Sequence, residues 1–405
     1  MNVLSVVPWI PHPSRLFRYV HSRFRKLDVQ RETVDAVLRE YGLKMTRRPR
    51  NLPMGWRNHC VVVDTDAGRK VLKQYRPQWN LGAVLCEHSI LNRLAQLNIA
   101  ATRVVATSDG QTCVARQGGI FALFDFIEGS TYSLTVIPNS HREELVGLAG
   151  KGLARIHRHL CGFVPEGKHH LGFRSYRGSR QRTSAWYAER VSELVERTRR
   201  MPNGEAKEMA EPLVRAGNDL IEELHSLDTL LGAANLPRTV IHGDYGFHNL
   251  IFHDGPELTV LDFELSRIEW RMYDIVMVLT RAWRSGMWEE FATRMRAFLA
   301  GYESEYPLDP IERQFFDQIW TMQNLQLAVK NWDSYFKTGF RLDRLSRSTN
   351  ALTVARDGST VASHVLRTAD NQRDSETPDD ERDSTTSHRT LALSNSRSCL
   401  GGESR

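Results

Sequence analysis

The sequence predicts an α+β fold with two lobes, a small β-rich N-lobe that contains one helix and a larger, mainly helical C-lobe. Short β-like runs separated by turn residues are concentrated between about residues 60 and 127. From about residue 145 to 336, apolar residues recur mostly at the helical period. We therefore divide the 405 residues into an N-terminal extension (1–27), an N-lobe (28–127), a C-lobe (128–345) and a tail (346–405).

The N-lobe is predicted to begin with a helix over about residues 28–43, which stops at Gly42. Two β-like runs, 60–63 and 70–75, flank the turn cluster Asp64–Gly68 and predict a hairpin. The other elements expected in this lobe are a helix over 81–98 and strands over 102–106, 112–115 and 120–127.

The C-lobe is predicted to be helical except for two short β-like pieces. The expected helices cover 145–159, 184–200, 213–231, 274–285, 289–303 and 311–336, and the β-like pieces cover 239–241 and 258–262. The tail from residue 346 is rich in Ser, Thr, Arg and Asp and has no aromatic residue. Because such a segment cannot bury enough apolar surface to offset its chain entropy, we expect it to be disordered.

Composition argues against several classes of partner. The net charge of +6 and pI of about 9.1 come without a dense basic block interleaved with aromatic residues, so no nucleic-acid partner is expected. No apolar run is long enough for a membrane span. The five cysteines are scattered and form no CxxC pair, which favours reduced thiols in a cytoplasmic protein over a zinc site or a disulfide framework.

The strongest chemical signal is the segment HGDYGFHN, which contains Asp244 and Asn249 and is followed thirteen residues later by Asp262. Phosphoryl transfer depends mainly on positioning and on electrostatic stabilisation by metal ions. Mg²⁺ prefers carboxylate, amide and phosphate oxygens as ligands. We therefore predict that Asp244 accepts the proton of an attacking hydroxyl and that Asn249 and Asp262 bind Mg²⁺.

These residues resemble the catalytic segment of the aminoglycoside phosphotransferase-like family, which includes choline kinases, type II homoserine kinases and spore-coat kinase-like proteins. The resemblance covers roughly residues 28–345 and is strongest around HGDxxxxN and the later Asp262. It implies a protein-kinase-like fold and the transfer of the γ-phosphate of ATP, with Mg²⁺, to the hydroxyl of a small molecule such as an amino alcohol or an amino sugar.

The resemblance also implies a nucleotide site in the N-lobe. Lys73 is placed where the family has a phosphate-binding lysine, with Lys70 as a competing candidate, and Glu87 is its expected partner. Glu87 also fits an ordinary acidic residue near a helix N-terminus. The family binds adenine through the backbone of the linker between lobes, which here corresponds to the four residues Phe124, Asp125, Phe126 and Ile127.

His242 and Asp274 are expected to support the catalytic loop rather than to carry protons. The sequence departs from protein kinases in two places. The stretch expected to cover the phosphates has a single glycine, Gly55, and Glu264 stands at the third position of the DFG-like element. No APE-like segment follows, so a protein kinase is disfavoured.

The sequence says less about which molecule accepts the phosphate. Glu269 and Asp333 are acidic residues that could assist the binding of a cationic amine by an aromatic cage. The aromatic residues of the C-lobe fit either such a cage or the hydrophobic core. They are Trp270, Tyr273, Trp283, Trp288, Trp320, Trp332, Tyr335 and Phe336. The alternative function is a catalytically weak, nucleotide-binding or scaffold protein with a kinase-like fold. The sequence indicates neither the identity of the acceptor nor the oligomeric state.

Overall fold

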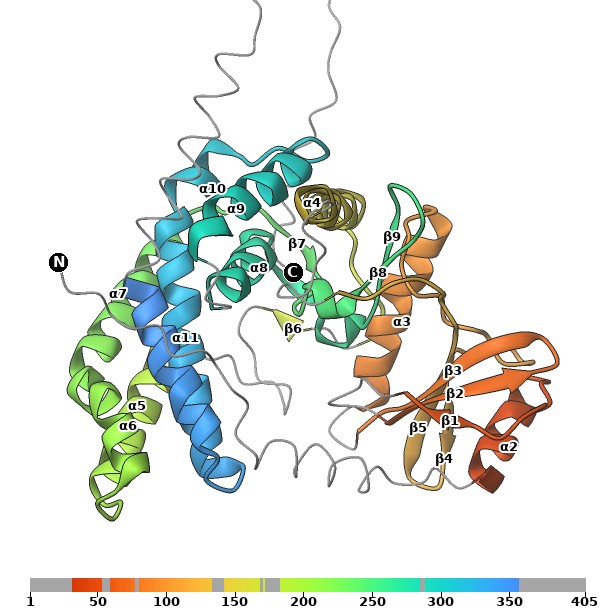
Figure 1. Cartoon of the computed structure of the whole chain (residues 1–405), viewed down its shortest axis with the longest axis horizontal. Helices are drawn as coiled ribbons and strands as arrows, with labels where there is room; N and C mark the ends of the chain where they lie inside the picture. The colour runs from red at the N-terminus through yellow and green to blue at the C-terminus, as the bar shows by residue number, and fades with distance from the viewer. Residues whose placement is uncertain are drawn as a thin grey trace, which may run out of the picture. The chain divides into compact units, whose positions relative to one another are not determined.

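The computed structural model describes residues 31–52, 59–76, 80–132, 142–167, 170–171, 183–284 and 288–356. The chain forms two compact units, one comprising residues 1–79 and 104–126 and the other 80–103 and 127–405. One sheet dominates the first unit and helices dominate the second, so the predicted α+β class is confirmed (Figure 1).

The first unit contains a five-stranded antiparallel sheet in the order β1-β2-β3-β5-β4. The predicted hairpin is present as β2 and β3, with Val61 opposite Leu72 and Leu72 opposite Leu123 of β5. The strand expected over 102–106 is absent, because this segment makes a single isolated bridge, from Val104 to Phe124. The strand bounds are β1 (Arg50–Asn51), β2 (His59–Thr65), β3 (Gly68–Gln74), β4 (Val114–Arg116) and β5 (Gly119–Asp125).

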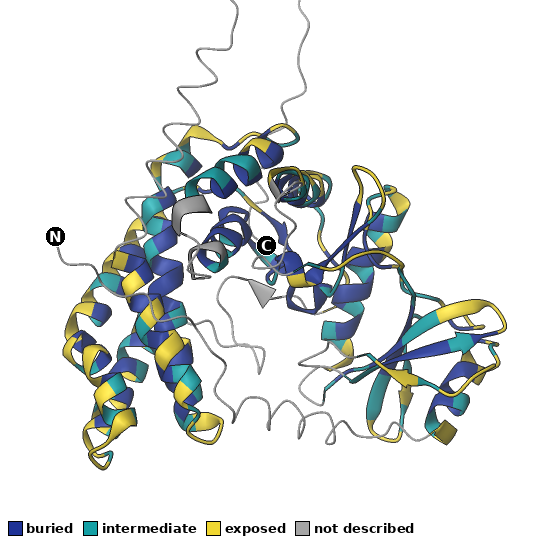
Figure 2. Cartoon of the chain, viewed as in Figure 1, coloured by how far each residue is buried: buried dark blue, intermediate teal, exposed yellow. Residues whose placement is uncertain are grey.

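Helix α2 (Arg31–Glu40) covers one face of this sheet and explains the core of the unit. Its apolar side chains lie three to four residues apart, so Val34, Val37 and Leu38 share one face of the helix. They pack with Leu72 and Leu123 of the sheet in one buried cluster. Buried residues are coloured dark blue in Figure 2. Successive side chains of a strand point to opposite faces, so the residue after Leu72 faces away from α2.

The second unit is built around helices. Its helix bounds are α3 (Leu81–Gln96), α4 (Arg142–His159), α5 (Ser184–Arg199), α6 (Glu205–Arg215), α7 (Gly217–Ala233), α8 (Met272–Arg284), α9 (Trp288–Glu303), α10 (Pro310–Gln314) and α11 (Phe316–Lys337). Helices α4 and α9 approach each other closely at glycines. A Cβ on Gly150 would lie 2.0 Å from the carbonyl oxygen of Phe298, and one on Gly301 would lie 2.0 Å from that of Gly147.

Short strands position the loops of the second unit. Strand β10 lies between β6, to which it is parallel, and β7, to which it is antiparallel, and β8 and β9 form a separate hairpin. Their bounds are β6 (His170–Leu171), β7 (Arg238–Ile241), β8 (Leu250–Phe252), β9 (Leu258–Val260) and β10 (Arg267–Trp270), with 3₁₀ turns η2 (Phe247–Asn249) and η3 (Phe263–Leu265).

Several sequence-based expectations need correction. The helix predicted over 311–336 is two helices separated at Phe315, and α3, assigned to the N-lobe, belongs to the second unit. The tail was predicted to be disordered from residue 346, but residues 342–356 form a helix. This helix buries Leu345, Leu352 and Val354, of which Leu345 and Leu352 lie seven residues apart and share one helical face. Residues 1–27, 53–58 and 357–405 lie outside the described residues.

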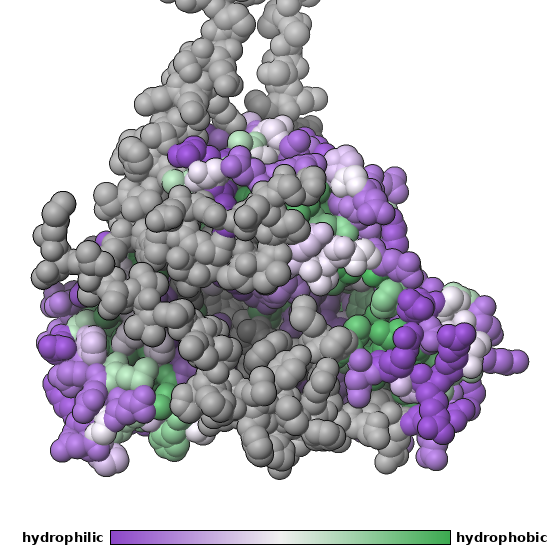
Figure 3. Space-filling view, viewed as in Figure 1, coloured by the Kyte–Doolittle hydropathy of each residue, from purple (hydrophilic) through white to green (hydrophobic). Residues whose placement is uncertain are grey.

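The described part of the chain has no helix that is long and apolar enough to cross a membrane. Its visible surface in Figure 3 is largely hydrophilic, with smaller apolar areas. Cys60, Cys86 and Cys113 are free thiols.

Candidate active site

The segment 242–249 forms a loop between β7 and β8, and Asp274 holds the beginning of this loop. The carboxylate of Asp274 accepts hydrogen bonds from the backbone N–H of His242 (2.7 Å) and of Gly243 (2.8 Å). Gly243 has a φ of +78°, and a Cβ there would lie 2.3 Å from the carbonyl oxygen of Leu265. Only glycine fits this close approach, so the HGD sequence has a local structural reason.

His242 connects the loop to the segment that ends in Asp262. Its Nδ1 accepts the backbone N–H of Asp244 (3.2 Å), so Nε2 carries the proton and donates to the carbonyl oxygen of Leu261 (2.8 Å). Burial lowers the pKa of His242, which favours this neutral form. The imidazole therefore fixes the spacing between the backbones that carry Asp244 and Asp262.

Asn249 brings the same two segments together through different atoms. Its side-chain Nδ2 donates to the carbonyl oxygen of Asp244 (3.0 Å), and its backbone carbonyl accepts the N–H of Leu261 (2.9 Å). This arrangement uses the amide nitrogen within the loop, so Oδ1 is the side-chain atom that could serve the predicted metal site. Asp262 has a left-handed backbone conformation, with φ of 63° and ψ of 65°. Such conformations are uncommon for non-glycine residues and cluster at functional sites.

Arg281 of α8 is a site residue that was not predicted. Its guanidinium forms an ion pair with the carboxylate of Asp244 and donates to the carbonyl oxygen of Tyr245 (2.7 Å). Arg281 lies seven residues after Asp274, which places both side chains on one face of α8, two turns apart. That spacing was the signal available in the sequence. Helix α8 thus anchors the 242–249 loop through Asp274 and orients the Asp244 carboxylate through Arg281.

Two buried polar side chains, His157 and Tyr302, are linked by hydrogen bonds to Asp274, and neither was predicted. His157 of α4 donates from Nε2 to Asp274 (3.2 Å), and its Nδ1 accepts from the hydroxyl of Tyr302 (2.9 Å). Burial lowers the pKa of His157, consistent with a neutral ring in this role. Burial would raise the pKa of Asp274, but the hydrogen bonds from His157 and from the Gly243 N–H keep it below its ordinary value. Asp274 is therefore an ionised anchor for the loop.

The candidate nucleotide residues lie in both units. Lys73 is buried on the face of β3 opposite to Leu72, with its ammonium 4.7 Å from the Tyr75 ring centroid. Lys70, the competing candidate, forms an ion pair with Asp125 at 2.7 Å. The predicted linker residues Phe124, Asp125 and Phe126 end the first unit, and Ile127 begins the second.

Glu87 is in the second unit, where it is buried on α3. This helix packs against η3, which directly follows Asp262. The roles of Lys73, Glu87 and the linker residues stay predictions.

The protein oxygens near the loop could bind a divalent cation only if other ligands completed its coordination. Among the described residues, no group of three or more His, Cys, Asp or Glu side chains could hold a metal ion. Asn249 and Asp262 supply one amide oxygen and one carboxylate. Mg²⁺ is commonly bound by one or two protein oxygens together with substrate phosphates and water, so this pair fits a metal that arrives with a nucleotide.

Two of the aromatic residues that fitted either the hydrophobic core or a cage can be assigned from their contacts. Trp320 and Trp332 are fully buried and donate from Nε1 to the carbonyl oxygen of Val354 (2.9 Å) and to the hydroxyl of Thr198 (3.0 Å). These two tryptophans therefore belong to the core.

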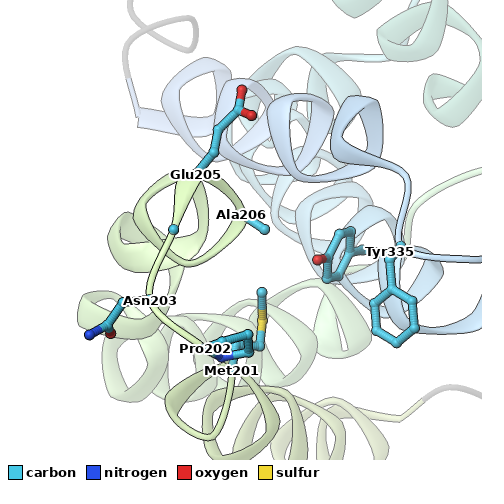
Figure 4. Close-up of a pocket in the computed structure, with 8 residues that line it drawn as sticks. Met201, Pro202, Asn203, Glu205, Ala206 and Tyr335 are labelled. Atoms are coloured by element: carbon cyan, nitrogen blue, oxygen red, sulfur yellow. The ribbon is translucent and has the colours of Figure 1, made fainter.

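A shallow, mostly apolar cavity of about 390 Å³ lies at the α5–α6 connection and the end of α11 (Figure 4). Met201, Pro202 and Tyr335 are among its lining residues, and none of the residues of the 242–249 loop lines it. The pocket in Figure 4 is therefore separate from the 242–249 loop.

The loop, its anchor and the sheet together define a phosphotransferase with a kinase-like fold. The model of the phosphotransferase enzyme family matches residues 49–308, and the chain belongs to this family. The homoserine kinase of Phenylobacterium zucineum (strain HLK1) is 25% identical over 287 residues, covering 71% of this chain and 80% of that protein. The homoserine kinase of Caulobacter vibrioides (strain NA1000 / CB15N) is 27% identical over 289 residues, covering 71% and 82%.

Solved structures show the same fold at lower identity. A microcompartment-associated aminopropanol kinase matches with a TM-score of 0.59 and 16% identity, covering 82% of this chain and 98% of that chain. The amicoumacin kinase hAmiN, solved in complex with AMP-PNP, Ca²⁺ and Ami, matches with a TM-score of 0.58 and 16% identity, covering 84% and 96%. The predicted family and its kinase-like fold are thus confirmed.

Proposed function

We propose that the protein transfers the γ-phosphate of ATP, with Mg²⁺, to the hydroxyl of a small amine-bearing molecule, with Asp244 as the catalytic base. The observation that carries this proposal is the hydrogen-bonded loop in which Asn249 contacts the backbone of Asp244 (3.0 Å) and of Leu261 (2.9 Å). Together with Asp262, this loop offers carboxylate and amide oxygens of the kind that support phosphoryl transfer. The relatives named homoserine kinase support an acceptor that carries both an amine and a hydroxyl.

Each residue has a distinct role in this proposal. Asp244 orients the acceptor hydroxyl and takes its proton, while Arg281 holds the Asp244 carboxylate in position. Asn249 and Asp262 hold the metal ion through oxygen atoms. When bound, Mg²⁺ neutralises charge on the phosphates and helps to orient them.

The proposed nucleotide-binding residues are Lys73, Glu87 and residues 124–127. Lys73 contacts its phosphates and Glu87 orients Lys73. The backbone of residues 124–127 contacts adenine. Support for the assignment of Lys73 over Lys70 comes from burial, since Lys73 is 6% exposed and Lys70 already pairs with Asp125.

The direct test is acceptor-dependent formation of ADP by the purified full-length protein with Mg-ATP and a panel of amino alcohols and hydroxy amino acids. We expect Asp244→Asn to lower kcat by about 10²- to 10⁴-fold, the usual contribution of a positioned base. Asp254→Asn, on the exposed turn between β8 and β9, is the matched control and should keep full activity. Equal acceptor-dependent turnover by wild type and Asp244→Asn would rule out this base, and no turnover of any acceptor by the wild type would favour the scaffold alternative.

A further inference from the structure

Helix α11 carries two buried glutamines whose side-chain hydrogen bonds are incomplete within the part of the chain that the structure describes. Gln326 is 4% exposed, and neither its Nε2 nor its Oε1 has a hydrogen-bond partner. Gln323 is equally buried and donates to the carbonyl oxygen of Tyr273 (3.2 Å), but its Oε1 has no partner. Buried polar groups are normally satisfied, so an unsatisfied carboxamide calls for an explanation such as a missing ligand.

Gln318 and Asn324 of α11 each also have one side-chain oxygen without a partner in the described part of the chain, but of these four residues only Gln326 has both of its amide atoms unpaired. Asp333, 9% exposed, forms ion pairs with Arg190 of α5 and with Lys337. The indoles of Trp320 and Trp332 both donate hydrogen bonds, as described above. Gln323 and Gln326 lie three residues apart, so their side chains lie on neighbouring positions of one face of α11.

This face is connected to the catalytic loop through the start of α8. Gln323 binds the carbonyl oxygen of Tyr273, and the next residue, Asp274, anchors His242 and Gly243. The guanidinium of Arg267 lies 4.4 Å from the centroid of the Tyr273 ring. A Cβ on Gly243 would lie 2.6 Å from Nη1 of the same arginine. Arg267 and Tyr273 therefore extend from the loop that carries Asp244 toward Gln323.

The available atoms specify the kind of group that would satisfy them. The two Oε1 atoms accept hydrogen bonds, and Nε2 of Gln326 donates. An ammonium group donates several hydrogen bonds, and a neighbouring hydroxyl or carboxylate oxygen accepts one. A compound that has an amine next to an oxygen acceptor matches this set, whereas an alcohol without an amine leaves the carbonyl oxygens unpaired.

We propose that Gln323 and Gln326 form the recognition site for the amine end of the phosphate acceptor and make the enzyme selective for amine-bearing alcohols. This inference rests on the proposed function, because it assigns the acceptor of that same reaction. In the bound complex, the acceptor extends from Asp244, where its hydroxyl reacts, to Gln326, where its amine and adjacent oxygen are bound.

The test uses the full-length protein, with homoserine as the probe and 4-hydroxybutanoate as its analogue without the amine. Binding is measured by calorimetry on Asp244→Asn, so that it does not depend on turnover. We expect homoserine to bind and 4-hydroxybutanoate to bind at least about 5-fold more weakly, because a site with buried polar groups rejects a ligand that leaves them unpaired.

In Gln326→Leu, the affinity for homoserine should fall roughly 5- to 100-fold, while KM for ATP stays unchanged. The melting temperature of Gln326→Leu should equal or exceed that of the wild type. If Gln326 had a purely structural role, its substitution would lower the melting temperature. Gln314→Leu, exposed on α10, is the control and should behave as wild type.

Three results would overturn the inference. They are equal binding of homoserine and 4-hydroxybutanoate, no binding of homoserine, and wild-type affinity in Gln326→Leu. Failure of the proposed function has a different signature, because amine-selective binding that depends on Gln326 would then persist without any acceptor-dependent formation of ADP by the wild type.

Discussion

Asp244 owes its geometry to three neighbouring groups, two from its own loop and one from α8. Arg281 pairs with its carboxylate, Asn249 binds its carbonyl oxygen, and the His242 ring accepts its N–H. The motif HGDxxxxN contains two of these three groups, and the third comes from α8. A catalytic carboxylate held at several points loses little entropy on reaching its reactive position.

Replacement of Arg281 tests this orientation. Lysine keeps the charge but lacks the planar fork that contacts both Asp244 and the carbonyl oxygen of Tyr245. We expect Arg281→Lys to lower kcat by roughly 10- to 100-fold, the scale of a small misplacement, with little change in KM for ATP. Steady-state kinetics provide the measurement, with Arg296→Lys on α9 as the control. An unchanged kcat would mean that Asp244 does not need this support.

The buried histidines predict how stability depends on pH. Burial lowers the pKa of both His157 and His242 below the value of about 6.5 for an unfolded histidine. Just below that pH the unfolded chain binds more protons than the folded chain. The stabilisation is therefore complete above about pH 6.5 and is lost as the pH falls toward the folded-state pKa.

Thermal unfolding between about pH 7.5 and 5 should show this loss as a falling melting temperature. His157→Gln should be less stable at neutral pH and should flatten the pH dependence, because the titrating group is gone. His159→Gln, at an exposed position of the same helix, should keep the wild-type slope. A slope that is identical in all three proteins would exclude His157 as a contributor.

At the scale of elements, the helix over residues 342–356 revises the expected organisation of the C-terminal part. The Trp320 indole donates to the carbonyl oxygen of Val354 (2.9 Å), and Ser348 donates to that of Ala328 (2.6 Å). This helix therefore completes the core around α11. Composition alone missed it, because its few buried aliphatic residues are diluted by the polar sequence that follows.

Truncation should distinguish this helix from the rest of the tail. A chain that ends at residue 345 loses the burial of Leu352 and Val354 and should lose about 3 kcal/mol or more of unfolding free energy. A chain that ends at residue 356 should stay close to wild type, as predicted for a disordered segment. Chemical denaturation measures both. Equal stability of the two truncated chains would show that residues 346–356 contribute nothing to the fold.

Short elements were harder to predict from the sequence than long ones. Long periodic segments such as α5 and α7 were predicted within a few residues. Strands β8 and β10 were missed, because three or four residues carry too little periodicity to identify a strand. Helix α6 was missed where Pro212 lies inside it, since proline usually ends a helical pattern.

At the scale of the whole molecule, the residues that a local motif contains were easier to predict than those that only the fold brings together. Asp244 and Asn249 share one loop, so their spacing was informative. Arg281 and Gln326 come from α8 and α11, and Arg281 could be found only through a weaker signal. For Gln326 the sequence offers no clear signal, because many other polar residues occur along α11.

The central claim is that Asp244, Asn249 and Asp262 serve one magnesium–nucleotide complex. The most direct measurement is a crystal structure of the protein with Mg²⁺ and a non-hydrolysable ATP analogue. We predict that an oxygen of Asn249 and one of Asp262 lie about 2.0–2.1 Å from Mg²⁺, the normal distance for this ion. The Asp244 carboxylate should face the terminal phosphate without binding the metal. A bound nucleotide whose metal is ligated by neither Asn249 nor Asp262 would contradict the account.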